Sequence, residues 1–549
     1  MRLILFFPFF ILFLNTGAFA AEDLKPYDVE VNGVNYTIDP RIELFNIIAM
    51  QFGHSGMTLS NIPYKKDILD RFSPWKDHAA PTVLRETWQK GWGVDDPMFF
   101  LLHLDEDLRI KENMPAAIIE RGGGMEQLEK LASAFQDYAE VSGFRQFFYK
   151  EQKDFYQQVL SQTRYTFRDF EAVDLLEDFF GKEGDKYTVI LNLISNYGNF
   201  GKIIESTGRS EFYAIVETNK KSGGIPVFEP TLSLQELILH EFSHGFVNPE
   251  MDEHSEALKG YEPLYSHVEN AMKQQGYHNW MPVVNEHVVR AAVLEMMAQH
   301  LEPQLVEQTI YKKEMGRQFL YLDKLREKLR IYQQNRTEFP TFKTYVPELI
   351  TAFSEITPDY LSQKTENLKR FLQPEIQKIP KPYEFARDST TLFVVGTHET
   401  DKAAQKKMHA FAEEYKNMFS EKIQLVTDEQ AFLMDLENYD LVLFGTVEGN
   451  LLLKDNFHEL PISISEKGIY TNKFIEGENL QLVSSWVSPY NADRVFVVYT
   501  AQNAADINNF YRSMHKDQFH YWVAQDLITL EKGDYKKYWN VWIPDILKY

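Results

Sequence analysis

The feature that most constrains this chain is an apolar segment near its middle, SLQELILHEFSHGFVNP, at residues 233–249. Leucine, isoleucine and phenylalanine recur almost all round a helical projection of it, which predicts a buried helix. Ser233 and Glu236 have the spacing of a capping box, so we expect the helix to begin there. We expect Pro249 to end it, because the residue before a proline is pushed out of the α region. The rest of the chain must cover such a helix on most sides.

Three polar residues, His240, Glu241 and His244, stand inside this apolar segment. Burying a carboxylate and two imidazoles is costly unless each finds a partner. The order H-E-x-x-H places both histidines on one helical face, where they could bind one metal ion. Glu241 would then lie beside the metal, next to a water molecule that the metal activates. The alternative is that buried carboxylates or carbonyls satisfy the imidazoles.

A catalytic zinc ion needs a third protein ligand, and the best candidate lies in PVVNEHVVRAAVLEMMAQHLEP, residues 282–303. Its apolar stripe predicts a second helix, on which Glu286 and Arg290 share another face. If this helix packs against the first, Glu286 reaches the metal and Arg290 orients the carboxylate. The alternative for this pair is a plain ion pair within one helix.

Other positions for the third ligand stay open. In the longer pattern H-E-x-x-H-x-x-G-x-x-H the ligand would fall at Glu250, where the pattern has histidine, and Val247 replaces the glycine. A folded loop could instead supply the ligand. Its candidates are His254, Glu256, Glu262, His267 and Glu269.

The first residues, MRLILFFPFFILFLNTGAFA, have an early arginine, an apolar run and a small-residue cleavage site. This pattern predicts a signal peptide over residues 1–20 and export to the periplasm or the extracellular space. No later segment has the roughly 20 apolar residues that a membrane span requires. The chain has no cysteine, so neither disulfides nor thiolate metal ligands are available. The formal charge of -23 argues against nucleic acid or an anionic membrane as a partner.

Residues 21–385 are predicted to form a mostly helical domain with a small sheet. Helical periodicity is clearest at 41–52, 125–141, 144–163 and 312–334. Residues 187–194 predict a buried strand, and the more alternating run 211–218 predicts an exposed or edge strand. The stretch between these two strands, SNYGNFGKIIESTGRS, is typical of a loop.

Residues 386–549 have a different pattern after a proline-rich linker, QPEIQKIPKPYEF. Strands are predicted at 391–395, 423–426, 441–444 and 495–499, and helices at 402–418 and 506–515. Their alternation favours a smaller α/β domain with a partly parallel sheet. A turn at residues 445–450 follows a strand but lacks the glycine spacing of a nucleotide site. Aromatic residues near the end either stack on sugars or, more commonly, belong to the core: Trp522, Tyr535, Tyr538, Trp539 and Trp542.

The chain resembles the gluzincin zinc peptidases, in which a glutamate after an asparagine follows H-E-x-x-H on the next helix. SNYGNFG, LHEFSHGFVNP and NEHVVRA also resemble a family of exported bacterial proteins known as a domain of unknown function with predicted metallopeptidase character. This likeness covers about residues 29–371. It implies an α+β, zincin-like fold, with His240, His244 and Glu286 as Zn2+ ligands and Glu241 as the base.

The resemblance has one departure and one gap. Many gluzincins have an aspartate four residues after the ligand glutamate, where this chain has Arg290. A tyrosine or histidine that stabilises the transition state is also expected. The candidates are Tyr261, Tyr265, His267, Tyr277 and His278.

The expected activity is zinc-dependent hydrolysis of peptide bonds, with the 211–218 strand pairing with an extended substrate. Two alternatives stand beside it: a zinc-binding protein without turnover, and a glycan-binding or surface-binding protein whose histidines are only core residues. The first alternative expects metal without cleavage, and the second expects no stoichiometric metal.

Overall fold

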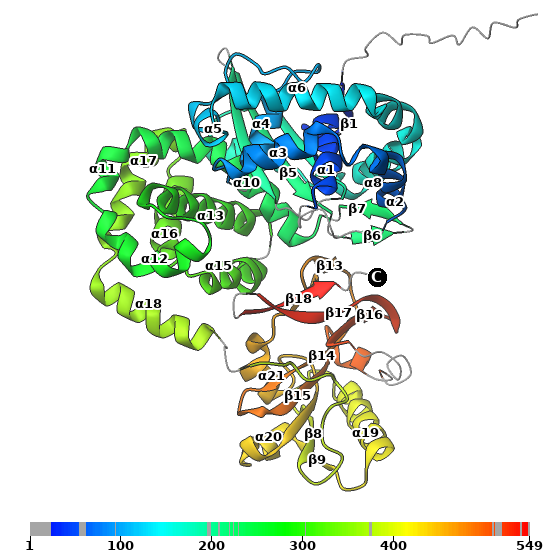
Figure 1. Ribbon diagram of the computed structural model, residues 1–549. Helices are drawn as coiled ribbons and strands as arrows, with labels where there is room; N and C mark the ends of the chain where they lie inside the picture. The colour runs from blue at the N-terminus through cyan, green and yellow to red at the C-terminus, as the bar shows by residue number, and fades with distance from the viewer. Residues whose placement is uncertain are drawn as a thin grey trace, which may run out of the picture. The chain divides into compact units, whose positions relative to one another are not determined.

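The structure is a computed structural model (Figure 1). It describes residues 24–53, 62–93, 95–194, 199–206, 209–218, 220–222, 224–228, 230–301, 303–372, 376–507, 510, 519–538 and 541–546. The predicted signal peptide lies outside these residues. The chain divides into two compact units, one of residues 1–28, 37–161 and 191–198, the other of residues 29–36, 162–190 and 199–549. The domain boundary predicted at residue 385 stays a prediction.

The first unit is helical. The expected helices at 41–52 and 125–141 are present as α1 and α6, and α6 buries Leu128, Leu131 and Phe135 at helical spacing. The segment predicted at 144–163 is not one helix, because a π-helical turn, Phe147–Glu151, separates α7 from α8. The helices that begin in this unit are α1 (Pro40–Gln51), α2 (Pro63–Phe72), α3 (Ala79–Gln89), α4 (Asp96–Leu102), α5 (Ala116–Arg121), α6 (Met125–Val141), α7 (Phe144–Gln146) and α8 (Lys153–Phe167).

A buried carboxyl group lies inside this unit. Glu43 on α1 accepts a hydrogen bond from the Tyr64 hydroxyl, which lies 2.7 Å from the Tyr156 hydroxyl. Burial raises the pKa of Glu43 from 4.5 to about 7, although the hydrogen bond from Tyr64 opposes this shift. Glu43 is therefore a group that titrates near neutral pH in the folded chain.

Glu43→Gln should remove a pH-dependent part of the stability. Between pH 4.5 and about 7 the folded chain keeps a proton on Glu43 that the unfolded chain has released. The contribution of Glu43 to the free energy of unfolding therefore falls as pH rises through this window, by about 3 kcal/mol at most. Urea unfolding at both ends of the window measures this fall. An equal fall in the glutamine variant would contradict the assignment.

The chain has a five-stranded sheet with strand order β1-β2-β3-β5-β4. Its strands are β1 (Tyr27–Val31), β2 (Val34–Ile38), β3 (Lys186–Asn192), β4 (Phe200–Ser206) and β5 (Arg209–Glu217). β4 and β5 form an antiparallel hairpin in which Phe200 is opposite Ile215 and Ser206 is opposite Arg209. A separate two-stranded ribbon consists of β6 (Lys220–Ser222) and β7 (Ile225–Val227).

The prediction that residues 211–218 form an edge strand is wrong. This run is β5, which lies between β3 and β4, and its residues Phe212, Ala214, Ile215 and Val216 are buried. The edge position belongs to β4, which formed part of the stretch predicted to be a loop. The alternation of apolar and polar residues at 211–218 did not indicate the position of this strand in the sheet. That position depends on which other strands pair with it, and these are distant in the sequence.

The apolar segment forms α10 (Leu232–Glu253), which lies against β4 and β5. Gly245 permits this contact, because a Cβ atom there would lie 2.2 Å from the Phe212 ring. The Phe246 ring stacks between the rings of Phe212 and Phe180, with centroids 4.7 and 4.6 Å away. The helix is therefore covered by the sheet on one side, as its composition requires.

Both predicted ends of this helix are wrong. Thr231 is the N-cap, and its hydroxyl accepts from the Leu234 amide at 3.3 Å, whereas Glu236 is buried and pairs with Lys313. The helix continues past Pro249 to Glu253. A proline removes one helical hydrogen bond, and the packing of the buried Met251 beyond it outweighs that loss.

The second predicted helix is α13 (Trp280–His300), which packs against α10 (Figure 1). The helix predicted at 312–334 is interrupted after Gly316, and Gln318 there has a positive φ of 66°. The other helices of this region are α9 (Ala172–Phe180), α11 (Ser255–Lys259), α12 (Tyr265–Gln274), α14 (Pro303–Val306), α15 (Lys312–Gly316), α16 (Leu322–Gln334), α17 (Phe342–Ile350) and α18 (Pro358–Phe371).

Residues 376–546 are built on an eight-stranded sheet of order β18-β17-β16-β14-β15-β10-β8-β9. The four strands β9, β8, β10 and β15 are parallel, which confirms the predicted partly parallel sheet. Its elements are β8 (Thr391–Val395), α19 (Lys402–Phe419), β9 (Gln424–Thr427), α20 (Asp428–Ala431), β10 (Asp440–Phe444), α21 (Leu451–Asn456), β14 (Leu480–Ser488), β15 (Asn491–Ala501), β16 (Tyr521–Gln525), β17 (Ile528–Tyr538) and β18 (Val541–Ile546). A three-stranded sheet consists of β11 (Ser463–Ser465), β12 (Gly468–Tyr470) and β13 (Phe474–Glu476).

Several smaller predictions in this region are settled. The second half of the predicted linker, residues 376–385, is docked on the sheet through the buried Ile376 and Ile379. In the 445–450 turn, the Thr446 amide and hydroxyl donate to Glu399 at 2.7 and 2.8 Å, so a carboxylate of the chain itself occupies these two donors. The helix predicted at 506–515 lies largely outside the described residues, which show a 3-10 turn at Ala504–Ile507.

Two of the aromatic residues considered for sugar stacking are buried in the core. Trp522 and Tyr535 are both about 4% exposed, whereas Trp542 is partly exposed. The side chains of Tyr538 and Trp539 lie outside the described residues. Together the two regions make this an α+β protein. Among the described helices, none combines the length and apolar character needed to cross a membrane.

Candidate metal centre

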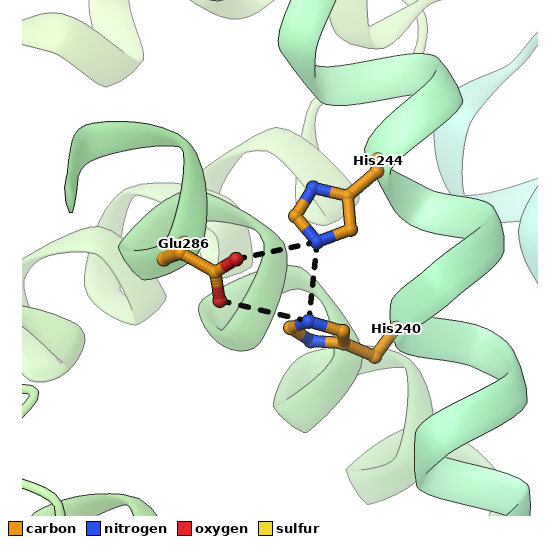
Figure 2. A group of neighbouring side chains, drawn as sticks. All are labelled: His240, His244 and Glu286. Atoms are coloured by element: carbon orange, nitrogen blue, oxygen red, sulfur yellow. Dashed lines mark hydrogen bonds and ion pairs between the residues drawn. The ribbon is translucent and has the colours of Figure 1, made fainter. Parts of the chain in front are cut away.

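Two helices bring together the three predicted metal ligands. His240 and His244 lie one turn apart on α10, and Glu286 projects toward them from α13 (Figure 2). The Nε2 atoms of the two histidines are 3.2 Å apart. Glu286 Oε2 lies 3.6 Å from His240 Nε2, and Glu286 Oε1 lies 3.5 Å from His244 Nε2. The three side chains thus converge on one point.

These distances fit a zinc ion. A tetrahedral zinc site with bonds of about 2.0–2.1 Å has ligand atoms about 3.3–3.4 Å apart. The 3.2 Å between the two Nε2 atoms and the 3.5 Å from His244 Nε2 to Glu286 Oε1 lie close to that value. His240 and Glu286 are buried and His244 is partly exposed, so the point of convergence is reached from one side.

The charge state of His240 also fits a metal ligand better than an internal ion pair. Burial and the nearby Arg290 guanidinium hold the pKa of His240 well below its ordinary value. The imidazole is therefore neutral at neutral pH and offers a lone pair. A salt bridge to Glu286 would require the protonated form, so an ion pair between these two side chains is unfavourable, whereas a neutral imidazole can still donate one N–H to a carboxylate.

Asn248, one turn beyond His244, orients the second imidazole. His244 Nδ1 lies 3.2 Å from Asn248 Oδ1. A hydrogen bond donated by Nδ1 to this amide oxygen leaves the lone pair on Nε2, the atom that faces the cluster. The i,i+4 spacing from His244 to Asn248 is visible in the sequence, and the analysis of the sequence missed it.

Arg290 contacts Glu286 as predicted. Its Nη2 atom donates to Glu286 Oε2 at 2.8 Å, and its Nη1 atom donates to Glu314 Oε2 at 2.8 Å. Burial acts to raise the pKa of Glu286, but Arg290, His244, Arg317 and Tyr277 together outweigh it and hold this pKa below its ordinary value. Glu286 is therefore a carboxylate at neutral pH. Glu314 is a member of the site that the sequence analysis missed.

Glu241 lies between the cluster and the edge strand β4. Burial and the like charge of Glu286 raise the pKa of its carboxyl from 4.5 to about 7. Gly201 on β4 makes the close approach possible, because a Cβ atom at this position would lie 2.3 Å from Glu241 Oε2 and 2.8 Å from Glu241 Cα. The role of Gly201, the last residue of SNYGNFG, was missed because residue 201 was assigned to a loop.

Among the five candidates for stabilising a transition state, Tyr277 lies at the site. Glu286 and Arg290 both act on the pKa of its hydroxyl, which therefore lies beside them. The Tyr265 hydroxyl donates to the Tyr277 carbonyl at 3.0 Å and so helps to position it. Tyr261 instead packs against the Phe353 ring. His267 and His278 are exposed.

The alternative third ligands have other surroundings. Glu250 lies 3.2 Å from Lys343 Nζ, and the His254 ring nitrogen lies 2.9 Å from the Glu250 carbonyl. Glu256 and Glu269 form ion pairs with Lys259 and Lys273. Within the part of the chain that the structure describes, the metal-ligating cluster consists of His240, His244 and Glu286.

The family described as a domain of unknown function (DUF4932) matches residues 34–352. The chain belongs to this family. No match was found among curated proteins or among solved structures. The DUF4932 region contains α10, α13 and α15, and therefore every residue of the cluster, whereas the eight-stranded sheet lies outside it. The family's description names no activity, so the function must be argued from the site. The likeness to gluzincins stays a prediction.

Proposed function

We propose that this protein is a zinc-dependent peptidase that hydrolyses peptide bonds. The observation that carries the proposal is the convergence of His240, His244 and Glu286 at distances that suit a tetrahedral metal ion, with Glu241 beside them. Two imidazoles and one carboxylate are a donor set found in catalytic zinc sites that keep a position open for water or substrate. The signal peptide expected at residues 1–20 supports action in the periplasm or outside the cell.

The chain's own residues supply the proton transfers. A zinc ion at this site would act as a Lewis acid toward a water molecule and the scissile carbonyl. Glu241 accepts a proton from the attacking water and returns it to the leaving amine. In the chain without a metal ion the pKa of this carboxyl is about 7, and the charge of a bound zinc ion would lower it and favour the carboxylate that accepts the first proton. The Tyr277 hydroxyl, beside Glu286 and Arg290, can donate a hydrogen bond to the developing oxyanion.

β4 is the proposed place for the substrate backbone. It is the last strand of its sheet among the strands that the structure describes, so its outer edge has no neighbouring strand. An extended peptide can add to such an edge through main-chain hydrogen bonds. Gly201 brings this edge against Glu241, so a peptide paired with β4 would pass beside the general base. This assignment replaces the earlier expectation that residues 211–218 bind the substrate.

Gly201→Ala tests the contact between the edge strand and the base. The added methyl group overlaps Glu241, so β4 or Glu241 must shift by an ångström or more. We expect a loss of about 1–3 kcal/mol in stability and about 10²-fold in the rate of peptide hydrolysis. Gly260→Ala is the matched control, because the nearest atom to its new Cβ is 3.5 Å away. Wild-type activity in Gly201→Ala would contradict the proposed geometry.

A peptide-library digest tests the function itself. Zinc-loaded mature protein is incubated with the library, and new peptide termini are identified by mass spectrometry. We expect cleavage that stops when a chelator is added and returns with zinc. Zinc binding without cleavage would favour the alternative of a zinc-binding protein without turnover. The glycan-binding alternative has lost part of its basis, because Trp522 and Tyr535 are buried.

A further inference from the structure

The guanidinium of Arg290 is held on several sides. It donates to Glu286 and to Glu314, each at 2.8 Å, and its Cζ atom lies 4.3 Å from the centre of the Phe319 ring. The side chain is about 5% exposed. A planar guanidinium that bridges two carboxylates over an aromatic ring has little freedom to rotate.

Glu314 stands at the far end of this bridge. It belongs to α15 and is about 1% exposed. Besides Arg290, it contacts Arg317 at 3.4 Å and Lys313 at 3.6 Å. Because of these cations, which outweigh its burial, the pKa of Glu314 falls to about 2. A fixed negative charge therefore lies behind Arg290.

The charges of the ion pairs connected to Arg290 balance one another. Lys313 also pairs with Glu236, so the connected groups comprise three carboxylates, Glu236, Glu286 and Glu314, and three cations, Arg290, Lys313 and Arg317. Of the carboxylates that contact Arg290 in the described part of the chain, Glu286 would remain if Glu314 were removed. The single negative charge of Glu286 would then have to neutralise the Arg290 guanidinium and also bind the metal ion.

We propose that Glu314 is a positioning residue that acts through Arg290 and holds Glu286 with one oxygen turned to the metal. The inference rests on the proposed metal centre. Both oxygens of Glu286 face the histidines, Oε2 at 3.6 Å from His240 Nε2 and Oε1 at 3.5 Å from His244 Nε2, but Arg290 already binds Oε2, so Oε1 is the oxygen that we assign to the ion.

A double-mutant cycle on the full mature chain tests this role. Zn2+ affinity is measured by competition with a chromophoric chelator for the wild type, Glu314→Gln, Arg290→Gln and the double variant. We expect each single variant to bind zinc about 10–100-fold more weakly. The double variant should be no weaker than Arg290→Gln alone, because Glu314 acts through Arg290.

Glu295→Gln is the matched control. Glu295 is also buried on α13 and also pairs with two arginines, accepting from Arg326 at 2.6 Å and from Arg330 at 2.9 Å. Glu295→Gln should lower the melting temperature about as much as Glu314→Gln does. Its zinc affinity should stay within about twofold of the wild type. The comparison separates positioning of the ligand from general stability.

The visible spectrum of the Co2+-substituted protein gives a second measure. In the wild type we expect the intense bands of a four-coordinate ion. If Glu314→Gln frees the second oxygen of Glu286, the coordination number rises and the bands weaken. If this variant does not fold, Arg290→Lys replaces it, because lysine keeps the charge but cannot bridge two carboxylates.

The outcomes distinguish this inference from the proposed function. Wild-type zinc affinity in Glu314→Gln, or in Arg290→Lys if that variant is needed, would overturn the positioning role. So would an equal loss of affinity in Glu295→Gln. Failure of the wild type to bind zinc would remove the metal centre itself. A wild type that binds zinc and cleaves peptides, with no effect of Glu314→Gln on affinity or spectrum, would overturn the positioning role alone.

Discussion

Glu241→Gln should keep its zinc and lose activity by about 10²–10⁴-fold, the usual contribution of a general base. Glutamine has nearly the same shape as glutamate, so the contact with Gly201 is preserved, but its amide accepts no proton at neutral pH. Glu241 does not belong to the ligand cluster, so metal affinity should change little. Initial rates on a cleaved peptide and zinc content of the same sample provide the measurement.

The pH profile adds a sharper test of the same residue. In the wild type, kcat/KM should fall on the acid side as Glu241 becomes protonated, and this limb should be absent from the residual activity of Glu241→Gln. Glu250→Gln is the control, because Glu250 is a partly buried glutamate of the same helix that pairs with Lys343. Activity of Glu241→Gln within twofold of the wild type would refute the proposed mechanism.

Glu286→Gln should have the second largest effect, a loss of zinc affinity of about 10²–10³-fold. Zinc sites with four ligands bind with roughly 10–16 kcal/mol, so each ligand contributes about 3–4 kcal/mol. The neutral amide is a poor ligand, and Arg290 loses one of its two carboxylate partners. Chelator competition measures the affinity, and peptide hydrolysis at limiting zinc should fall in parallel.

Glu295→Gln is again the control for this loss, since it disrupts a buried ion-pair network on the same helix. Glu286→Gln should bind zinc much more weakly than Glu295→Gln at a similar thermal stability. If the two variants bound zinc equally well, Glu286 would not be a ligand. The third ligand would then have to come from another part of the chain.

The local part of the candidate site was predictable from the sequence. Four-residue spacing on an α-helix fixes the common face of His240 and His244 whatever surrounds the helix. The same spacing predicted the contact between Arg290 and Glu286, which the structure shows at 2.8 Å. Placing Glu286 opposite the histidines needed one further assumption, that the two helices pack together, and α10 and α13 do so.

The rest of the site depends on contacts between distant parts of the chain. Gly201 and Glu314 reach the cluster from β4 and α15, and no local pattern indicates either contact. The edge strand was misassigned for the same reason, since the position of a strand in a sheet is set by its neighbours. The prediction at Pro249 was wrong for the opposite reason. Proline is a strong local signal for the end of a helix, but packing on both sides of Pro249 keeps the helix intact to Glu253.

The metal content of the purified mature protein is the most direct test of the central claim. The protein is incubated with zinc, desalted and assayed by elemental analysis, beside a His244→Ala variant. We expect about one zinc ion per chain in the wild type and little or none in the variant. A wild type that retains no metal would contradict the account, because the imidazoles of α10 would then be core residues and the proposed enzyme would have no catalytic centre.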